Sequence, residues 1–408
     1  MEVIHSRCAG LDVHKKSVVA CIRIVEGNSV RHEVRTFGTT TSALYELADW
    51  LSAEEVTHAA MESTGVYWKP VWHILEECCE LVLANAQHIR NVPGRKTDVN
   101  DATWIADLLA HGLIRGSFVP ERGVQELREL TRTRKQFVRE RSRYVQRIQK
   151  VLEDANIKLA SVISNVVGKS GRAILTAVIA GESDPRKLAR LAQGLKASEE
   201  ALAEALRGHV TDHHRFMLKL YLEQLDALDA AIAAIERQAE AAMRPFREAA
   251  ELLVTMPGVS TTVATAMVAE LGCDMARFPT RAHLISWAGL CPRSNESAGK
   301  RRSTRLRDGA PWLKTILVQA AWAAARTKGS YERAQFLRLK SRRGPKKAIV
   351  AVAASMLGAA YHILRNRLPY RTLGANHFDQ HDRAALQRRL VRRLEALGYC
   401  VDLKHAAA

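Results

Sequence analysis

The chain has 408 residues, of which 61 are Lys or Arg and 43 are Asp or Glu, and its formal net charge at pH 7 is +18. This excess of positive charge excludes an acidic or near-neutral solvated protein and indicates a polyanionic partner. An apolar fraction of 47% excludes a globally disordered chain. The seven cysteines show no C-x-x-C spacing, which disfavours a disulfide framework and a zinc ribbon.

The first 115 residues alternate between strand and helix patterns. In chain order, these patterns predict strands at 9–13, 18–25 and 30–37, a helix at 42–51, a strand at 56–61, a helix at 66–79, a strand at 81–84 and a helix at 98–111. Strands alternating with helices in this way predict an α/β domain with a mixed sheet, which we place at residues 1–120.

A strongly basic helix is predicted next. Residues 122–150 contain ten basic and three acidic residues on a helical pattern. Such a segment can be a solvated charged helix, but its surplus of positive charge favours contact with a phosphate backbone. The candidate nucleic-acid-binding residues of this helix are Arg132, Arg134, Lys135, Arg139 and Arg143.

A seven-residue repeat occupies residues 216–243. Apolar residues recur every seven positions, and a second apolar residue follows each of them after three positions; the first set is Leu218, Leu225, Ile232 and Ala239. This repeat predicts a short coiled-coil seam, formed either within one chain as a helical hairpin or between two copies. We assign residues 121–250 to a basic helical and coiled-coil region that links domains or mediates oligomerisation.

A mostly α-helical unit is predicted at residues 251–370. Helical patterns at 249–255 and 261–271 flank Met256-Pro257-Gly258-Val259, which is similar to a helix-hairpin-helix motif, whose backbone amides can hold a phosphate. A polar, basic loop is predicted at 293–309, and apolar helices at 312–325 and 348–364. The second apolar helix is shorter than the ~20 residues needed to cross a bilayer, so we expect it to be buried. Residues 371–408 form a charged tail.

Two carboxylates follow predicted strands, and two more begin a predicted helix. Asp12 ends the first strand, Glu62 comes just after another, and Asp98 and Asp101 lie three residues apart, on one helix face. Oxygen ligands of this kind hold Mg²⁺, and two such ions ~3.5–4 Å apart can stabilise the attacking and leaving oxygens in phosphodiester chemistry. Each carboxylate could instead be structural, as a turn residue or a partner of the helix dipole. Together, in an α/β domain of a basic chain, they predict a magnesium site.

These residues belong to six sequence blocks that occur in a fixed order. The blocks are Gly10-Leu11-Asp12-Val13-His14-Lys15, Met61-Glu62-Ser63-Thr64-Gly65-Val66-Tyr67-Trp68, Arg95-Lys96-Thr97-Asp98-Val99-Asn100-Asp101-Ala102, Met256-Pro257-Gly258-Val259, Ser286-Trp287-Ala288-Gly289-Leu290-Cys291-Pro292 and Asn295-Glu296-Ser297-Ala298-Gly299-Lys300. From about residue 7 to about residue 365, the chain resembles the DEDD transposases of the insertion-sequence "one-ten" family, relatives of the pilin-gene invertases. The resemblance implies a RuvC-like, ribonuclease-H-type N-terminal domain and a C-terminal transposase domain.

The resemblance also implies a nucleophile. In the family, a serine of the C-terminal domain attacks a DNA phosphodiester and forms a phosphoserine link, and the carboxylate domain supplies magnesium to a composite active site. The matching residue here is Ser297, with Ser294 and Ser303 as neighbouring alternatives, because Ala298 separates Ser297 from the glycine that directly follows the serine in many relatives. Basic residues around it would offset phosphate charge, namely Arg293, Lys300, Arg301 and Arg302.

Partners follow from the same resemblance. It implies donor and target DNA, a structured guide (bridge) RNA encoded beside the gene, and assembly as homodimers and then homotetramers. It implies no membrane association. Because no apolar secretion segment is visible in the first 16 residues, we expect a cytoplasmic, nucleoid-associated bacterial protein.

Two other functions are compatible with the sequence. One is a magnesium-dependent, structure-specific endonuclease like the Holliday-junction resolvases, which would use the four carboxylates to activate water and would need no serine. The other is a catalytically silent nucleic-acid-binding protein, for which neither Asp12 nor Ser297 would matter beyond affinity. The intact set of four acidic residues argues against the silent protein.

Overall fold

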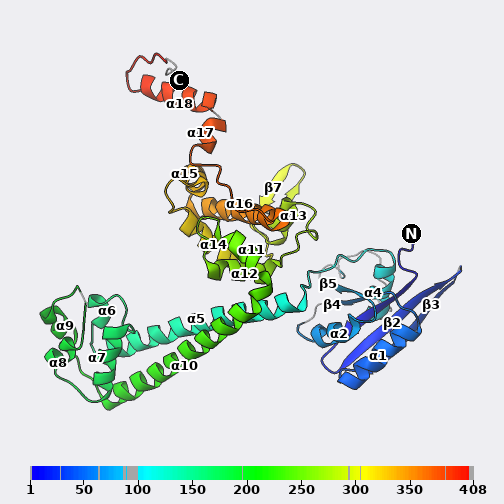
Figure 1. Cartoon of the computed structure of the whole chain (residues 1–408), viewed down its shortest axis with the longest axis horizontal. Coiled ribbons are helices and arrows are strands. Elements are labelled where there is room, and N and C mark those ends of the chain that lie inside the picture. The colour runs from blue at the N-terminus through cyan, green and yellow to red at the C-terminus, as the bar shows by residue number, and fades with distance from the viewer. Residues whose placement is uncertain are drawn as a thin grey trace. The chain divides into compact units, whose positions relative to one another are not determined.

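The computed structural model describes residues 2–27, 29–62, 65–85, 89, 100–194, 196–292, 295–303, 305–381 and 383–403. The chain divides into two compact units, Met1–Val119 and Pro120–Ala408, which can be followed by colour in Figure 1. All seven cysteines are free thiols.

The first unit is built on a five-stranded mixed sheet. Its strands are β1 (Arg7–Val13), β2 (Ser17–Glu26), β3 (Ser29–Gly38), β4 (His58–Glu62) and β5 (Glu80–Ala84), in the spatial order β3-β2-β1-β4-β5. The first three strands pair antiparallel, whereas β4 runs parallel to β1 and to β5. The predicted α/β domain with a mixed sheet is therefore confirmed.

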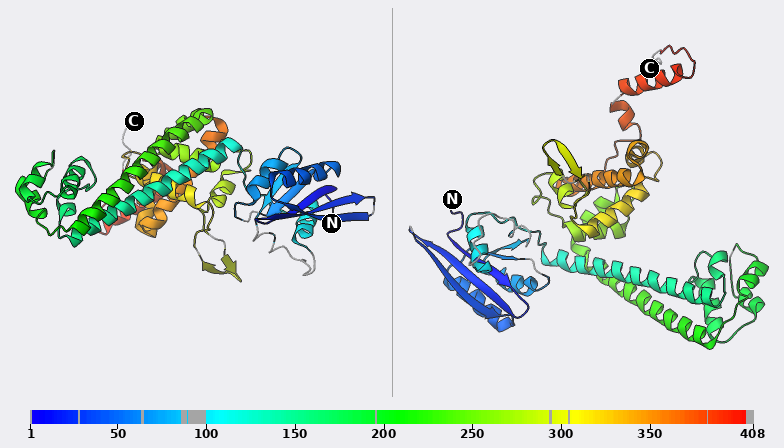
Figure 2. Two further views of the ribbon diagram at one scale, coloured as in Figure 1. Left: turned by 90° about the horizontal axis from the view of Figure 1, so that it is seen from below. Right: turned by 180° about the vertical axis from the view of Figure 1, so that it is seen from behind.

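Helices cover both faces of this sheet (Figure 2). On one face, α1 (Thr41–Ala53) and α2 (Trp68–Leu75) pack on a core that includes Leu11, Leu47 and Val71. On the other face, α4 (Asp101–Ala110) packs on Cys8 and Ala60 of the central strands. Alternate residues of β1 and β4 enter the two cores, as the two-residue period of a strand requires.

The second unit begins with a long helical hairpin. Helix α5 (Arg122–Asp154) and helix α10 (Asp212–Ala242) run antiparallel, and α6 (Leu159–Val162), α7 (Lys169–Ile179), α8 (Pro185–Arg190) and α9 (Glu199–Ala205) connect them at the far end. Ion pairs Arg134–Glu236 and Arg141–Asp229 fix the antiparallel register along the hairpin. Leu218 and Leu225 of the predicted seam are fully buried. The chain therefore forms the intramolecular hairpin, and pairing between two copies stays a prediction.

The remainder of the second unit is mostly helical, as predicted. Its elements are the 3₁₀ turn η1 (Arg244–Phe246), α11 (Arg247–Val254), α12 (Thr261–Leu271), α13 (Arg281–Trp287), β6 (Asn295–Ser297), β7 (Lys300–Ser303), α14 (Pro311–Ala324), α15 (Tyr331–Arg343), α16 (Pro345–Asn366), α17 (His377–His381) and α18 (Arg383–Glu395). The predicted loop at 293–309 contains a short antiparallel hairpin, β6–β7, because two positive-φ residues close a tight turn between the strands.

Helix α16 lies at the centre of this part. It is long and apolar enough to cross a membrane, with a mean hydropathy of 1.6, but 61% of that stretch is buried inside the protein. Val352, Ala353 and Leu357 have no exposed surface and pack with residues of α12 and α14. The expectation of a buried helix is therefore confirmed, and the helix is longer than the pattern indicated.

The turn between α11 and α12 is shaped by packing. Gly258 has a φ of +78°, and a Cβ atom built on it would lie 2.4 Å from the carbonyl oxygen of Ala320 and 2.5 Å from the nitrogen of Ala324. The backbone of this turn therefore lies directly against α14, which accounts for the glycine. A helix-hairpin-helix role in phosphate binding stays a prediction.

A buried ion pair joins α5 to α12. The carboxylate of Glu270, 3% exposed, accepts hydrogen bonds from Nε and Nη2 of Arg132 at 2.7 and 2.8 Å. One turn earlier, Arg128 donates to the carbonyl oxygens of Ala269 and Glu270, at the C-terminal end of α12. Burial lowers the pKa of Arg128 to about 10, and the charge of Glu270 opposes this shift. These contacts fix α5 to the helical part that follows.

Removing one partner of this pair should cost much more stability than removing an exposed pair. We expect Glu270→Ala to lower the free energy of unfolding by about 2–4 kcal/mol, since it leaves Arg132 half-buried without its carboxylate. The matched control is Glu236→Ala, which breaks the exposed pair between Glu236 of α10 and Arg134 of α5. It should lower the free energy of unfolding by about 0–1 kcal/mol. Urea unfolding measures both, and equal costs would contradict the structural role of Glu270.

Candidate active site

Two of the predicted carboxylates occupy equivalent positions on neighbouring parallel strands. Leu11 of β1 pairs with Met61 of β4, and Asp12 and Glu62 are the next residues of the two strands. Leu11 and Met61 point into the core beneath α1 and α2. Because strand side chains alternate between faces, Asp12 and Glu62 both belong to the opposite face, the one that α4 covers.

A glycine brings α4 to these carboxylates. A Cβ atom on Gly10 would lie 2.1 Å from the carbonyl oxygen of Ala102 and 2.4 Å from the nitrogen of Ala106. Helix α4 therefore rests directly on the backbone of β1, which only glycine permits. At the other end of the strand, the Ile4 amide donates to the carbonyl of Ala110 at 2.8 Å. The helix thus runs antiparallel to β1, and its N-terminus lies at the end of the strand that carries Asp12.

The first turn of α4 supplies the third carboxylate. Asn100 caps the helix by accepting a hydrogen bond from the Ala102 amide at 2.9 Å, and Asp101 follows as an exposed residue. Sequence reasoning placed this helix start at Asp98, which lies outside the described residues. The structure therefore brings Asp12, Glu62 and Asp101 to one end of the sheet, while the place of Asp98 stays a prediction.

The donor chemistry of this end suits a hard divalent cation. The three side chains offer only carboxylate oxygens, and Asp12 is 23% exposed with its Oδ2 3.1 Å from Nε2 of His14. Among the described residues, no three Asp, Glu, His or Cys side chains are close enough together to form a metal cluster. Asp12, Glu62 and Asp101 are the residues that would hold a cation, with further oxygens coming from Asp98, water or substrate phosphate.

The predicted nucleophile lies in the second unit, at the end of a strand. Ser297 is the last residue of β6 and pairs with Lys300 of β7. The turn between them is formed by Ala298 (φ +50°) and Gly299 (φ +72°), both exposed. A non-glycine residue at positive φ carries strain of about 1 kcal/mol or more. The turn that follows Ser297 is therefore short, exposed and strained.

The basic residues near Ser297 are only partly described. The backbones of Lys300, Arg301 and Arg302 belong to β7, and the side chain of Lys300 is exposed. Arg293 and the alternative nucleophile Ser294 lie outside the described residues, whereas Ser303 ends β7 and accepts a hydrogen bond from the Arg305 amide.

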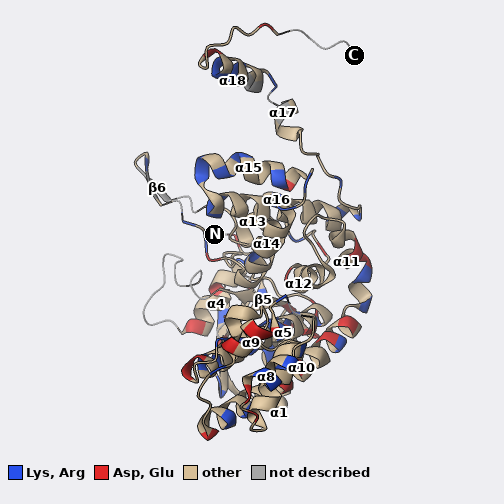
Figure 3. Ribbon diagram, turned by 90° about the vertical axis from the view of Figure 1, so that its left-hand side faces the viewer, with Lys and Arg blue, Asp and Glu red and all other residues tan. Residues whose placement is uncertain are grey.

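The basic side chains of α5 do not form one uniform phosphate-binding surface. Arg132 is bound to Glu270, and Arg134 donates to Glu236 at 2.8 Å. Both are thus paired with carboxylates of the same chain, because one helix face packs on α12 and another on α10, which the sequence pattern does not show. Arg139 and Arg143 are exposed. Other elements of the second unit, including α15 and α18, also carry Lys and Arg along their length (Figure 3).

Sequence reasoning missed one aromatic residue beside this helix. Trp312 begins the apolar helix predicted at 312–325, now α14, and its ring faces the cationic groups of three α5 residues at 5.5–6.0 Å; these are Arg132, Lys135 and Arg139. No signal in the sequence links positions so far apart along the chain.

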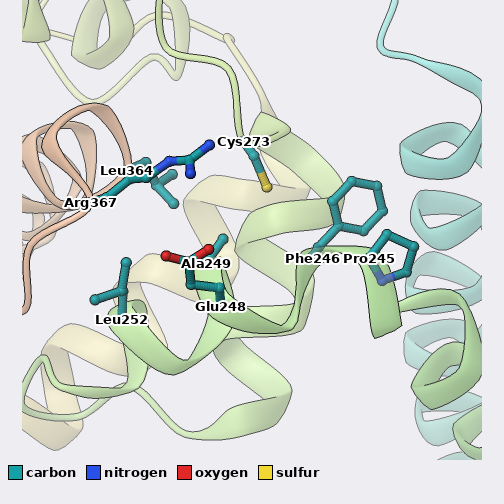
Figure 4. A pocket seen from close by; sticks show the side chains of 8 residues that line it. All are labelled: Pro245, Phe246, Glu248, Ala249, Leu252, Cys273, Leu364 and Arg367. Atoms are coloured by element: carbon teal, nitrogen blue, oxygen red, sulfur yellow. The ribbon is translucent and has the colours of Figure 1, made fainter.

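A small pocket of about 130 Å³ lies elsewhere in the second unit. Its walls come from η1, α11 and the end of α16, with Arg367 at one side, Phe246 at the other and Cys273 between them (Figure 4). None of the predicted site residues lines it. A well-formed cavity is often a binding site, but neither the carboxylates nor Ser297 line this pocket.

Comparison with known families and proteins agrees with the chemistry of this site. Residues 9–157 match the family model of the IS110-type DEDD transposases, and residues 250–337 match a model described as the transposase IS116/IS110/IS902 family. The chain is 26% identical over 271 residues to a "Probable family 20 transposase" of Pseudomonas aeruginosa, covering 65% of this chain and 71% of that one. It is also 26% identical over 243 residues to the "Mini-circle putative transposase for IS117" of Streptomyces coelicolor, covering 54% of this chain and 58% of that one.

The class of protein is therefore a DNA transposase. The two matched segments together cover more than half of the chain and describe the same family. The chain belongs to the IS110 family of transposases, which confirms the resemblance seen in the sequence. Membership of a DEDD transposase family indicates the use of a divalent metal cation.

The position of α4 against Gly10 can be tested by adding one carbon. We expect Gly10→Ala to destabilise the protein by about 3 kcal/mol and to abolish strand cleavage, since the new Cβ meets the backbone of α4, which cannot move aside as a side chain can. Thermal unfolding and cleavage of an element-end duplex measure the two effects.

The matched control for this change is Gly38→Ala, at the end of β3. There the nearest atom to a new Cβ lies 3.4 Å away and is a side-chain carbon of Ala43. This substitution should change stability by less than about 1 kcal/mol. A Gly10→Ala protein as stable and active as Gly38→Ala would show that α4 does not rest on β1.

Proposed function

We propose that this transposase cuts and rejoins the DNA strands of an insertion sequence through a transient phosphoserine at Ser297. The observation that carries the proposal is the convergence of Asp12, Glu62 and the N-terminus of α4 at one end of the sheet. The exposed turn that follows Ser297 supports it from the second unit. The strand order of the sheet supports the RuvC-like, ribonuclease-H-type fold that the family resemblance implies.

The proposed reaction exchanges one phosphate ester for another. The hydroxyl oxygen of Ser297 attacks a DNA phosphorus atom, its proton passes to a base, and the bond from phosphorus to the leaving strand breaks to give a free hydroxyl. A hydroxyl of a second strand then attacks the phosphoserine, which joins the strands and restores the serine. Bound Mg²⁺ would stabilise the developing negative charge. Asp12, Glu62, Asp98 and Asp101 would hold it.

Partners belong to the same proposal. We propose donor and target DNA as substrates and a structured guide RNA that pairs with both, since a basic protein can hold such a duplex by its backbone while base pairing reads the sequence. The carboxylate unit of one subunit would complete the serine site of another in a dimer or tetramer. Lys300, Arg301, Arg302 and Arg293 would neutralise the phosphate that Ser297 attacks.

A covalent-trapping assay tests the chemistry directly. The protein, expressed with its native flanking DNA so that any adjacent RNA is made, is given Mg²⁺ and a plasmid carrying the element junction. A denaturing gel then separates protein-linked DNA. We expect an adduct with the wild type and a loss of roughly a thousandfold or more in both Ser297→Ala and Asp12→Ala. Ser303→Ala, on the neighbouring strand, is the matched control and should retain the adduct.

The same assay separates the rival functions. Free cleaved ends without an adduct, unchanged by Ser297→Ala but lost in Asp12→Ala, would indicate a RuvC-like endonuclease that uses water. Binding without any cleavage would indicate a silent nucleic-acid-binding protein. An adduct that survives Ser297→Ala and disappears in Ser303→Ala would move the nucleophile to β7.

A further inference from the structure

Three cations of α5 crowd around one aromatic ring. The guanidinium carbons of Arg132 and Arg139 lie 5.6 and 5.5 Å from the centre of the Trp312 ring, and the Lys135 nitrogen lies 6.0 Å from it. The three residues are spaced three and four apart, so they share one face of the helix. The Trp312 ring belongs to the first turn of α14. We call this group the Trp312 cluster.

The Trp312 cluster contains more positive charge than its surroundings neutralise. Glu270 is the carboxylate that binds it, and both oxygens of Glu270 are taken by Arg132. Within the described part of the chain, neither Lys135 nor Arg139 forms an ion pair with a carboxylate. Two positive charges at the ring therefore have no anionic partner there.

Of the three cationic groups in the Trp312 cluster, the ammonium group of Lys135 has the least favourable environment. Its nitrogen is shut off from solvent and has no hydrogen-bond partner among the described residues, although an ammonium carries three donors. Burial lowers the pKa of Lys135, the charge of Arg139 lowers it further, and Glu270 opposes both. A cation–π contact contributes about 0.5–2 kcal/mol, and one ring cannot replace the missing hydrogen bonds of this group.

An anion with several acceptor oxygens would supply the partner that Lys135 and Arg139 lack. Beyond the cluster, the exposed residues Arg143, Arg147 and Lys150 continue along α5 at spacings of four, four and three residues. This row spans about 16 Å from Arg139, at 1.5 Å per residue. A row of cations of this length fits successive phosphates of a nucleic-acid backbone better than a single small anion.

We propose that the Trp312 cluster is a built phosphate site, in which a backbone phosphate of nucleic acid binds Lys135 and Arg139 beside the Trp312 ring. The site rests on the proposed function, because it supposes a nucleic-acid substrate or guide. Arg132 has a positioning role: it neutralises Glu270, whose charge would otherwise repel the phosphate. Arg143, Arg147 and Lys150 hold the following phosphates along α5.

Lys135→Met tests the site in two independent ways. Methionine keeps most of the apolar stem and removes the ammonium. Because the wild-type ammonium is buried without a partner, the free variant should melt at the same or a higher temperature than the wild type. Its affinity for nucleic acid should fall about tenfold. The slope of log affinity against log salt concentration should fall by about 0.9 for duplex DNA or about 0.7 for single-stranded RNA.

The matched control is Arg141→Met, six positions further along the same helix. Arg141 is paired with Asp229 of α10, outside the Trp312 cluster, so this variant should bind both probes like the wild type. The probes are a fluorescein-labelled duplex of the element end and a labelled RNA transcribed from the flanking DNA. If the salt slope of Lys135→Met falls on just one of the two probes, that probe identifies the nucleic acid that supplies the phosphate.

Two results would overturn the site. The first is an unchanged salt slope on both probes in Lys135→Met. The second is a lower melting temperature with unchanged affinity, which would make Lys135 a structural residue. Both readouts are independent of Ser297 chemistry: if trapping shows no phosphoserine but Lys135→Met still loses its salt slope, the proposed reaction fails and the phosphate site stands. If trapping shows the phosphoserine but Lys135→Met keeps the wild-type salt slope, the phosphate site fails and the proposed reaction stands.

Discussion

The direct contact between α4 and the backbone of β1 is the constraint on which the candidate active site depends. A helix normally packs on a sheet through a layer of side chains, but at Gly10 a single carbon atom would already overlap the helix backbone. This close approach brings the first turn of α4, with Asp101, to the strand end that carries Asp12. The parallel pairing of β1 with β4 adds Glu62 at the same level. Backbone packing thus places three carboxylate residues from distant parts of the sequence at the same end of the sheet.

Carboxylates at the same end of a sheet repel one another, and a bound cation would reduce this repulsion. At this end of the first unit, His14 lies beside Asp12. Its imidazole carries a positive charge only when it is protonated. A divalent cation is the group whose charge and ligand preference suit these oxygens. In the proposed phosphodiester reaction, the acidic residues at this end of the sheet would hold the metal, and basic residues elsewhere in the chain would bind the rest of the strand.

The basic residues of the second unit divide into two groups with different physical roles. Arg128 and Arg132 bind the end of α12 and the buried Glu270, so they contribute to folding. Lys135 and Arg139 lie on the same helix, a turn further on, without carboxylate partners in the described part of the chain, which is unfavourable for the free protein. The unpaired charges of Lys135 and Arg139 lower the stability of the free protein. In the proposed phosphate site, a bound polyanion would make these charges favourable.

The fold of the first unit could be predicted closely from sequence because its signals are local. Alternating apolar residues define β1–β3, helical periodicity defines α1, and each observed element overlaps its predicted range. Asp12, Glu62 and the helix start near Asp101 could be selected for the same reason, since carboxylates at strand ends stand out in the pattern. The β6–β7 hairpin was not predicted, because a basic stretch with few apolar residues gives no two-residue period.

The sequence by itself determined the family, the order of elements and the residue types that carry the chemistry, since these depend on spacing and composition along the chain. Tertiary structure alone decided which cations are paired with a carboxylate and which are not. Arg132, Arg134 and Lys135 look alike in sequence, yet one is bound to Glu270, one to Glu236 and one is left beside Trp312. That distinction depends on what faces each side of α5, and contacts between residues more than a hundred positions apart leave no periodic trace in a single sequence.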